Sequence, residues 1–267
     1  MRSFAFAVVY WLFSIVYSLA ALILSLLPGR KPVLWIIQRY TRRMVWAMDA
    51  VAGIKLDIRG RENVPAEPVI FAAKHQSWGD GFSIYSQFSD LAFVTGDHLE
   101  KYPMMGTLLR KLGAIVVNNC GGHEARKNLS QRSAEAARDG RHILIYPEGH
   151  LNAPGTYRRY RSGVWHMYKN FQRPVVPVAT NLGLFWQEMQ YKKTPGTAVL
   201  QFLEPIPVGL DKNTFMATLQ SRIEDHTQAL IAEATGLSIQ PSVLIDETPE
   251  RAAKRDKTSN TLAQTVE

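Results

Sequence analysis

The sequence predicts an α/β domain, a sheet flanked by helices, preceded by an N-terminal hydrophobic helix or a two-helix membrane anchor. Beyond Gly53, short apolar runs alternate along the chain with stretches of helical periodicity. This alternation is typical of helices packed on a largely parallel or mixed sheet. Before Gly53, the chain carries an uncharged apolar run at residues 4–27, which has the length of a membrane helix.

Two kinds of segment make up the predicted domain. Residues 54–58 (IKLDI) alternate apolar and polar side chains, as a half-buried strand does. The other strand candidates are short apolar runs at 69–73, 91–94, 114–117, 143–146, 175–179 and 199–203. The helix candidates between them lie at 81–88, 105–112, 124–138, 163–170 and 212–233.

The run at residues 4–27 is predicted to be a membrane helix. As a helix it would extend about 36 Å, which exceeds the hydrocarbon thickness of about 30 Å. A secretory signal peptide is the main alternative, but its apolar core normally spans about 7–15 residues before a small-residue cleavage site. Here the run is longer and ends in Pro28-Gly29-Arg30-Lys31. A buried core helix is the third interpretation.

Basic residues flank this run unequally. Only Arg2 and the amino terminus precede it, whereas several basic residues follow it. The positive-inside bias therefore predicts that the chain beyond residue 30 faces the cytoplasm, with the protein on the inner (cytoplasmic) membrane. The basic residues that follow the run are Arg30, Lys31, Arg39, Arg42 and Arg43.

Residues 33–51 are predicted to form a second, amphipathic helix. Trp35 and Trp46 lie near its apolar face, and arginines lie on the opposite face, a pattern that suits a lipid interface. An ordinary surface helix on the domain is the alternative. The predicted organisation is thus a membrane anchor at 1–52, an α/β domain at 53–240, and a tail at 241–267. The tail is polar and lacks aromatic residues after Pro249, so it is expected to be disordered.

Composition limits the classes of partner. The chain has 31 Lys plus Arg against 23 Asp plus Glu, a net charge of +8, which suits nucleic acid or an anionic membrane surface. Much of the surplus lies beside the apolar run, so we expect lipid and not nucleic acid. The single cysteine, Cys120, excludes an intramolecular disulfide and cannot alone form a thiolate metal site.

His75 and Asp80 are the candidate catalytic pair. They follow the strand candidate at 69–73, within Lys74-His75-Gln76-Ser77-Trp78-Gly79-Asp80. Five residues apart on a regular helix, the two side chains would not share a face. They meet if His75 lies on a turn and Asp80 on the first helical turn after it. An aspartate on one imidazole nitrogen leaves the other nitrogen to accept a proton.

A second turn follows the strand candidate at 143–146. Tyr146-Pro147-Glu148-Gly149-His150 places a sharp turn at the end of a strand, where ligands gather in open α/β sheets. Glu148 is expected to accept a hydrogen bond from a substrate hydroxyl. The alternative is a strand-terminating turn with a solvated glutamate.

Taken together, these motifs resemble the 1-acylglycerol-3-phosphate acyltransferase family, within the wider glycerolipid acyltransferases that carry His-x4-Asp. The match consists of His75-x4-Asp80, Gly113-Ala-Ile-Val-Val, Pro147-Glu-Gly and a Val-Pro-Val at 176–178, in that order. The resemblance covers about residues 55–235. Asn181-Leu-Gly-Leu-Phe-Trp186 and Pro195-Gly196-Thr197, leading to Glu204-Pro-Ile-Pro207, look like the version found in alpha-proteobacterial members.

The resemblance implies an enzyme that moves a fatty acyl group from an acyl thioester to the free hydroxyl of a lysolipid, most simply 1-acylglycerol-3-phosphate. His75 would be the general base and Asp80 would hold it. Backbone amides of the turn would stabilise the oxyanion. The donor would be coenzyme A or acyl carrier protein, with no cofactor and no metal. The implied substrate-binding residues are Gly113, Asn118, Pro147, Glu148, Gly149, Arg158 and Arg161.

Several departures from the family concern cations. The second motif ends in Asn118-Asn119 where the family has Asp-Arg, and the third reads Pro-Glu-Gly-His-Leu where the family has Pro-Glu-Gly-Thr-Arg. Lysines common in the family are replaced by Gly96 and Asp97. A phosphate prefers paired guanidinium or ammonium groups. Either the arginines at 158, 159 and 161 replace them, or the acceptor is a different lysolipid such as lyso-ornithine lipid.

Three other function classes compete with this interpretation. A metal-dependent hydrolase would use His75, Asp80, Glu148 and His150 as ligands, but no paired-histidine metal motif is present. A nucleic-acid-binding module would explain only the basic charge. A catalytically inactive lipid-binding scaffold would explain the eroded motifs, but it would have no need of both His75 and Asp80.

Overall fold

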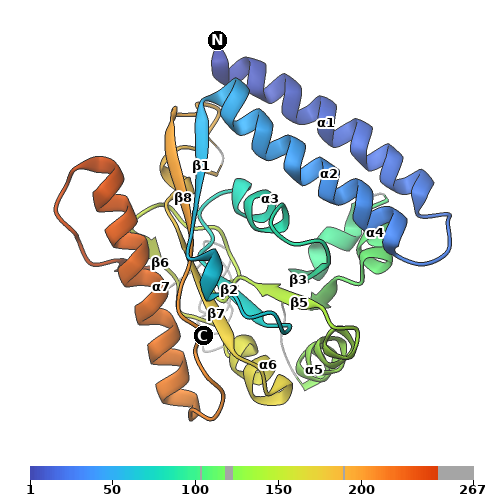
Figure 1. Cartoon of the computed structure of the whole chain (residues 1–267), viewed down its shortest axis with the longest axis vertical. Coiled ribbons are helices and arrows are strands. Elements are labelled where there is room, and N and C mark those ends of the chain that lie inside the picture. Colours follow the sequence, from blue (N-terminus) through green and yellow to red (C-terminus); the bar gives the residue numbers. More distant parts are fainter. Residues whose placement is uncertain (103, 118–122, 189, 246–267) are drawn as a thin grey trace, which may run out of the picture.

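The computed structural model describes residues 1–102, 104–117, 123–188 and 190–245. A seven-stranded sheet forms the centre of the molecule, in the order β1-β8-β7-β2-β5-β3-β4 (Figure 1). Only β7 and β8 pair antiparallel within it. The predicted α/β class with a largely parallel or mixed sheet is therefore confirmed.

Each strand candidate is found as a strand. Their apolar runs pair with one another because only neighbouring strands satisfy a buried backbone. The strands are β1 (Ile54–Arg59), β2 (Ile70–Ala73), β3 (Leu91–Gly96), β4 (Ile115–Val117), β5 (His142–Ile145), β7 (Val175–Thr180) and β8 (Gly196–Phe202).

Helices cover both faces of the sheet. Along β2, Ile70 and Ala72 face a core shared with α5, α6 and α7, while Phe71 and Ala73 face a core shared with α3. This alternation is the period of a strand buried on both faces. The helices are α3 (Gly79–Tyr85), α4 (Met105–Leu112), α5 (His123–Arg138), α6 (Gly163–Phe171) and α7 (Lys212–Thr235), with short 3-10 segments at Arg61–Asn63, Asp97–Lys101 and Leu182–Leu184.

Two further helices, α1 (Arg2–Leu24) and α2 (Lys31–Ala47), lie side by side along one edge of the domain (Figure 1). A π-helical turn, Met48–Ala52, extends α2 and ends at Gly53, whose φ of 75° favours glycine. The apolar face of α2 is not free to enter lipid, because Val33 and Ile36 are buried in a core with Leu108 and Leu112 of α4. This packing favours the surface-helix alternative for that face.

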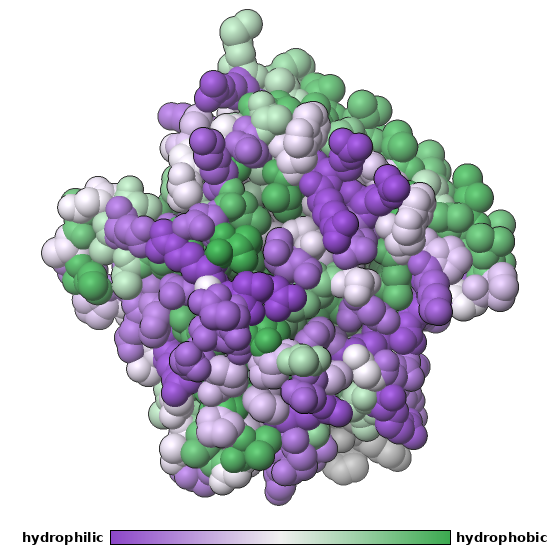
Figure 2. Space-filling view, in the orientation of Figure 1, coloured by the Kyte–Doolittle hydropathy of each residue, from purple (hydrophilic) through white to green (hydrophobic). Residues whose placement is uncertain are grey.

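The outer side of α1 is a continuous apolar surface, visible as the green edge in Figure 2. Among the described helices, α1 alone has the length and composition of a membrane span, yet it packs on the domain at both ends. Arg39 stacks on Trp35 of α2 at 4.5 Å, so the exposed face of α2 also combines aromatic and cationic groups. The exposed apolar residues of α1 include Phe4, Val8, Trp11, Leu12, Ile15, Val16, Leu19 and Ile23.

The C-terminal segment crosses back to the domain after α7. Two-residue strands β6 (Thr156–Tyr157) and β9 (Val243–Leu244) pair in parallel. Residues 242–245, expected to belong to a disordered tail, are therefore bonded to the domain. Residues 246–267 of that tail lie outside the described residues.

Candidate active site

The His75 turn lies at the carboxyl end of β2, next to the carboxyl end of β5. Asp80 is fully buried in the first turn of α3, and its Oδ2 lies 3.1 Å from Nδ1 of His75. The same oxygen accepts hydrogen bonds from the backbone N–H groups of Gln76 and Ser77, at 2.7 and 2.8 Å. The carboxylate of Asp80 thus closes the turn between the two residues. His75 and Asp80 meet although side chains five positions apart would not share a face of one helix.

Local sequence explains this turn. The Ser77 hydroxyl accepts from the backbone N–H of Gly79 at 2.9 Å, an interaction typical of turn serines. Gly79 must be small, since a Cβ there would lie 2.7 Å from Leu182 and 2.9 Å from Trp186. The glycine therefore lets α3 begin close to the loop that follows β7.

The imidazole of His75 is oriented from two sides. Its ring stacks on the ring of Tyr146, with centroids 3.8 Å apart and planes 15° apart. Its Nδ1–H donates to Asp80, which assigns the acceptor role to Nε2. The side chain is 18% exposed. This arrangement can remove a proton from a group that approaches from solvent.

Four amides of the turn are already engaged. Besides Gln76 and Ser77, Gly79 donates to the Ser77 hydroxyl and Asp80 donates to the Ser77 carbonyl at 3.2 Å. The expectation that turn amides stabilise an oxyanion is therefore wrong for these four groups, because they hold the catalytic turn together instead.

The turn after β5 is built for rigidity. Gly149 has a φ of 71°, and a Cβ there would lie 2.7 Å from Nε of Arg161. The backbone N–H of Arg161 donates to the Pro147 carbonyl at 2.8 Å, and its guanidinium lies 3.0 Å from Nε2 of His150. Pro147 and Gly149 thus place Arg161, which is exposed, beside the turn.

Glu148 does not face the substrate side of this turn. Its side chain is fully buried, and Nζ of Lys74 lies 3.1 Å from Oε1. Burial, opposed by Lys74, raises its pKa to about 7. Glu148 was predicted to accept a hydrogen bond from a substrate hydroxyl, but in the structure its buried carboxylate accepts from Asn152 and from the backbone N–H of Arg158.

Arg158 is joined to the catalytic turn through one residue. Asn152 donates its backbone N–H to the His75 carbonyl at 2.9 Å and accepts from Nε of Arg158 at 2.9 Å. The structure therefore brings Arg158 into the neighbourhood of His75, as a cation site near the base requires. Asn118, the other predicted polar contact, lies outside the described residues.

Gly113 lies at the opposite edge of the sheet. It ends α4 with a φ of 62° and precedes β4, so it is at the amino end of the parallel strands. Its carbonyl accepts from the buried guanidinium of Arg141 at 3.1 Å, and Arg141 also binds Asp90 at 2.6 Å. Gly113 therefore lies at the end of the strands opposite to His75, where its conformation ends a helix, and its contact with substrate stays a prediction.

Sequence reasoning missed three polar residues of the site: Lys74, Asn152 and Glu224. A lysine directly after the apolar strand VIFAA was a usable signal, since a cation there is either buried and paired or ends the strand. Glu224 gave no signal, because it is 150 positions away in α7 and meets Lys74 only in the fold. In the part of the chain that the structure describes, no group of three His, Cys, Asp or Glu residues is placed to hold a metal.

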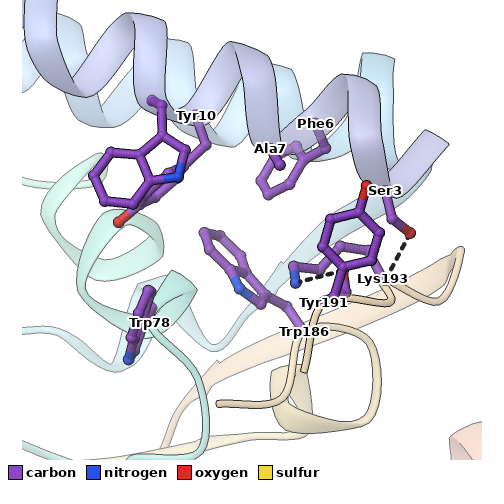
Figure 3. Close-up of a pocket in the computed structure, with 9 residues that line it drawn as sticks. Ser3, Phe6, Ala7, Tyr10, Trp78, Trp186, Tyr191 and Lys193 are labelled. Atoms are coloured by element: carbon purple, nitrogen blue, oxygen red, sulfur yellow. Dashed lines mark hydrogen bonds between the residues drawn. The ribbon is translucent and has the colours of Figure 1, made fainter. Parts of the chain in front are cut away.

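An aromatic pocket lies beside the catalytic turn. Trp78, between His75 and Asp80 in the sequence and 44% exposed, forms one wall, and Tyr10 of α1 and Trp186 face it (Figure 3). Tyr10 stacks on Trp78 with centroids 6.5 Å apart. The apolar surface of α1 therefore continues through Tyr10 to Trp78, which is three positions after His75 in the sequence.

Comparison with known proteins agrees with this geometry. A family model described as Acyltransferase matches residues 55–181. The chain is 31% identical over 180 residues to the 1-acyl-sn-glycerol-3-phosphate acyltransferase of Pseudomonas aeruginosa, covering 67% of this chain and 70% of that protein. It is 30% identical over 112 residues to the lyso-ornithine lipid O-acyltransferase of the same organism, covering 42% of each chain.

The fold also has a solved counterpart. The crystal structure of the 1-acyl-sn-glycerophosphate acyltransferase PlsC from Thermotoga maritima superposes with a TM-score of 0.70 at 21% identity, covering 87% of this chain and 98% of that one. Together with the Pseudomonas relative, these matches show that the chain belongs to the 1-acyl-sn-glycerol-3-phosphate acyltransferase family.

Proposed function

We propose that this acyltransferase transfers a fatty acyl group from a thioester to the hydroxyl of 1-acylglycerol-3-phosphate, with His75 as general base. The observation that carries the proposal is the His75–Asp80 pair at the carboxyl edge of the sheet. Nε2 of His75 takes the hydroxyl proton while the oxygen attacks the thioester carbon. The C–O bond forms and the C–S bond breaks, so the thiolate of coenzyme A or acyl carrier protein leaves the acyl carbon and receives the proton from His75.

Arg158 and Arg161 are the proposed phosphate-binding residues. Both lie on the segment that follows the Pro147-Glu148-Gly149 turn, and Arg158 shares Asn152 with the catalytic turn. Guanidinium groups bind phosphate oxygens in pairs. These two residues would replace the cations that the family carries in its second and third motifs.

A different lysolipid is the second candidate acceptor. It is favoured by the loss of those cations and by the similarity to lyso-ornithine lipid O-acyltransferases of Pseudomonas aeruginosa and Rhodobacter capsulatus, although these matches span 42% and 34% of the relatives. An acceptor without phosphate has no need of a paired arginine site.

We also propose that α1 lies in one leaflet of the cytoplasmic membrane and does not cross it. Phe6 packs on Trp186 with centroids 5.0 Å apart, and Ala21 at the other end is buried with Val33 and Leu108. A crossing helix would carry one end about 30 Å from the domain. The apolar outer face of α1 and the Trp35–Arg39 stack on α2 instead suit a helix that rests in an interface.

The test is an acyl-transfer assay on membranes that contain the protein. Labelled acyl-coenzyme A and acyl carrier protein thioesters are offered with lysophosphatidate, lyso-ornithine lipid or lysophosphatidylcholine, with His75→Ala as the blank. Arg158→Gln and Arg161→Gln are assayed in parallel, and Arg173→Gln, on the amino side of β7, is the matched control.

We expect transfer to lysophosphatidate, with its KM raised by the two site substitutions and unchanged by the control. If the main transfer is to lyso-ornithine lipid, and its rate is unchanged in Arg158→Gln and Arg161→Gln, the acceptor is the second candidate. Near-normal turnover by His75→Ala would refute the base assignment. Absence of any transfer that depends on His75 would favour an inactive lipid-binding scaffold.

A further inference from the structure

A buried ionic cluster lies directly beneath the catalytic turn. Nζ of Lys74 is 2.8 Å from Glu224 Oε1, 3.0 Å from Glu224 Oε2 and 3.1 Å from Glu148 Oε1. The side chains of Lys74 and Glu148 are fully buried, and that of Glu224 is 8% exposed. The cluster joins three elements that are remote in the sequence: the ends of β2 and β5, and the middle of α7.

The charges of this cluster do not cancel. One ammonium faces two carboxylates, and an uncompensated charge is costly in a buried site. The groups around the two carboxylates donate to them: Tyr160 and Ser242 donate hydroxyl protons to Glu224 at 2.9 and 2.8 Å, and the backbone N–H of Arg158 donates to Glu148 at 2.8 Å. The Thr156 carbonyl accepts from Nζ of Lys74 at 2.8 Å. Burial raises the pKa of Glu148 to about 7 against the opposing effect of Lys74, and repulsion from Glu224 adds to the rise, so Glu148 is partly protonated near neutrality.

The cluster is connected to His75 in two ways, through the preceding residue Lys74 and through a hydrogen bond from Asn152. Lys74 precedes His75, and its own backbone N–H donates to the Val178 carbonyl at 3.0 Å. On the other side, Asn152 bonds the Glu148 carboxylate at 2.8 Å through its amide and the His75 carbonyl through its backbone. A shift of the cluster would therefore move the backbone of the base itself.

We propose that Lys74 and Glu224 are positioning residues for the acyl transfer, and that α7 is through them a part of the active site. Glu224 lies outside the residues that match the family model, 55–181. The inference rests on the proposed function, because it takes His75 as the base. It implies that the length of the Glu224 side chain, which we call its reach, matters more to turnover than its charge does.

Two substitutions at Glu224 separate reach from charge. Glu224→Gln keeps the length of the side chain and an acceptor for Lys74, whereas Glu224→Asp keeps the charge and withdraws the acceptor by one methylene. Glu233, on the same helix but in an exposed ion pair with Arg59, supplies matched controls as Glu233→Gln and Glu233→Asp. The readouts are kcat, the KM of the thioester and the melting temperature, in detergent micelles.

We expect Glu224→Asp to lower kcat by on the order of 10-fold, with the thioester KM unchanged, because a small misplacement of a base is costly in rate. Glu224→Gln is expected to stay within about threefold of the wild type, and both controls to match it. Glu224→Asp with wild-type kcat, or a loss confined to Glu224→Gln, would overturn the inference.

A second set of variants separates positioning from stability. Lys74→Met leaves two buried carboxylates without their cation and is expected to lower both melting temperature and kcat. Adding Glu148→Gln and Glu224→Gln removes those charges, so the melting temperature should recover, since neutral replacement of a buried ion cluster is often tolerated. We expect kcat to remain on the order of 10–100-fold below the wild-type value, because the contacts of Lys74 that fix the catalytic turn are still absent.

Recovery of wild-type kcat by this neutral triple variant would refute positioning and leave charge balance as the role of the cluster. His75→Ala distinguishes this failure from that of the proposed function. If His75→Ala is inactive while Glu224→Asp and the neutral triple variant turn over normally, only the further inference fails.

Discussion

Replacing Asp80 by asparagine removes one negative charge from beside His75 and changes almost nothing in volume. Oδ2 of Asp80 accepts from two backbone donors, Gln76 and Ser77, as well as from His75. Because the backbone groups can only donate, the new amide must turn its oxygen toward them. His75 then keeps its tautomer and its partner. The amide NH2 takes the place of Oδ1, which has no hydrogen-bond partner in the described structure, so some stability is lost as well. The loss in rate comes from the electrostatic stabilisation of the imidazolium.

The size of that loss follows from the geometry. The imidazolium charge is spread over two nitrogens, the nearer of which is 3.1 Å from Oδ2. Unit charges about 3–5 Å apart interact by about 3–5 kcal/mol at an effective dielectric constant of about 20. About 1.4 kcal/mol is a factor of ten in rate, so kcat should fall by about 10²–10⁴-fold.

The assay measures initial rates of thiol release at saturating acceptor, with circular dichroism and the melting temperature as checks of folding. Asp90→Asn is the matched control, because Asp90 pairs with Arg141 at the opposite edge of the sheet. It is expected to alter stability and leave kcat intact. A folded Asp80→Asn protein that works within about threefold of the wild-type rate would refute the role of Asp80 as an electrostatic partner.

Three further predictions follow from single contacts. Tyr146→Phe should keep kcat because the ring that stacks on His75 is retained, whereas Tyr146→Leu should lower it by on the order of 10-fold; equal rates in a steady-state assay would contradict an orienting role for the ring. Burial raises the pKa of Glu148 from 4.5 to about 7 in the folded state. Between these two pH values the folded state keeps a proton that the unfolded state has released. The contribution of Glu148 to stability therefore falls as pH rises through this window. Urea unfolding at about pH 5 and about pH 8 should therefore show wild type losing up to about 3 kcal/mol relative to Glu148→Gln, and a constant difference would count against it. Gly113→Ala should lower the melting temperature, since its Cβ would lie 2.7 Å from Nη1 of Arg141, and leave kcat/KM unchanged; a selective loss of kcat/KM would restore Gly113 to the substrate site.

The sheet and its flanking helices could be predicted because each is a local pattern. The strand at Ile70–Ala73 is apolar on both faces, and the sequence VIFAA carries that information without its neighbours. The pair β6 and β9 could not be predicted in this way. Each has two residues, and they meet only because α7 returns the chain to the domain. Pairing across such a distance leaves no periodicity to detect.

The environment of α2 was ambiguous for a different reason. An apolar stripe opposed by arginines is the same pattern whether the stripe faces lipid or protein. The structure buries the stripe, with Val33 and Met44 fully covered, and exposes Trp35 and Trp46 on the other side. The sequence shows that a helix has an apolar face, but the covering partner depends on tertiary packing.

The buried cluster bears directly on where the acceptor phosphate binds. The chain lacks the cations of the family's second and third motifs, and Lys74, next to His75, would otherwise be an attractive substitute. Its charge, however, is outnumbered by Glu148 and Glu224, and its side chain is fully buried. An ammonium held by two carboxylates cannot also attract a phosphate. Arg158, one residue removed from His75 through Asn152, is therefore the stronger candidate, and its substitution is the more informative test of the acceptor.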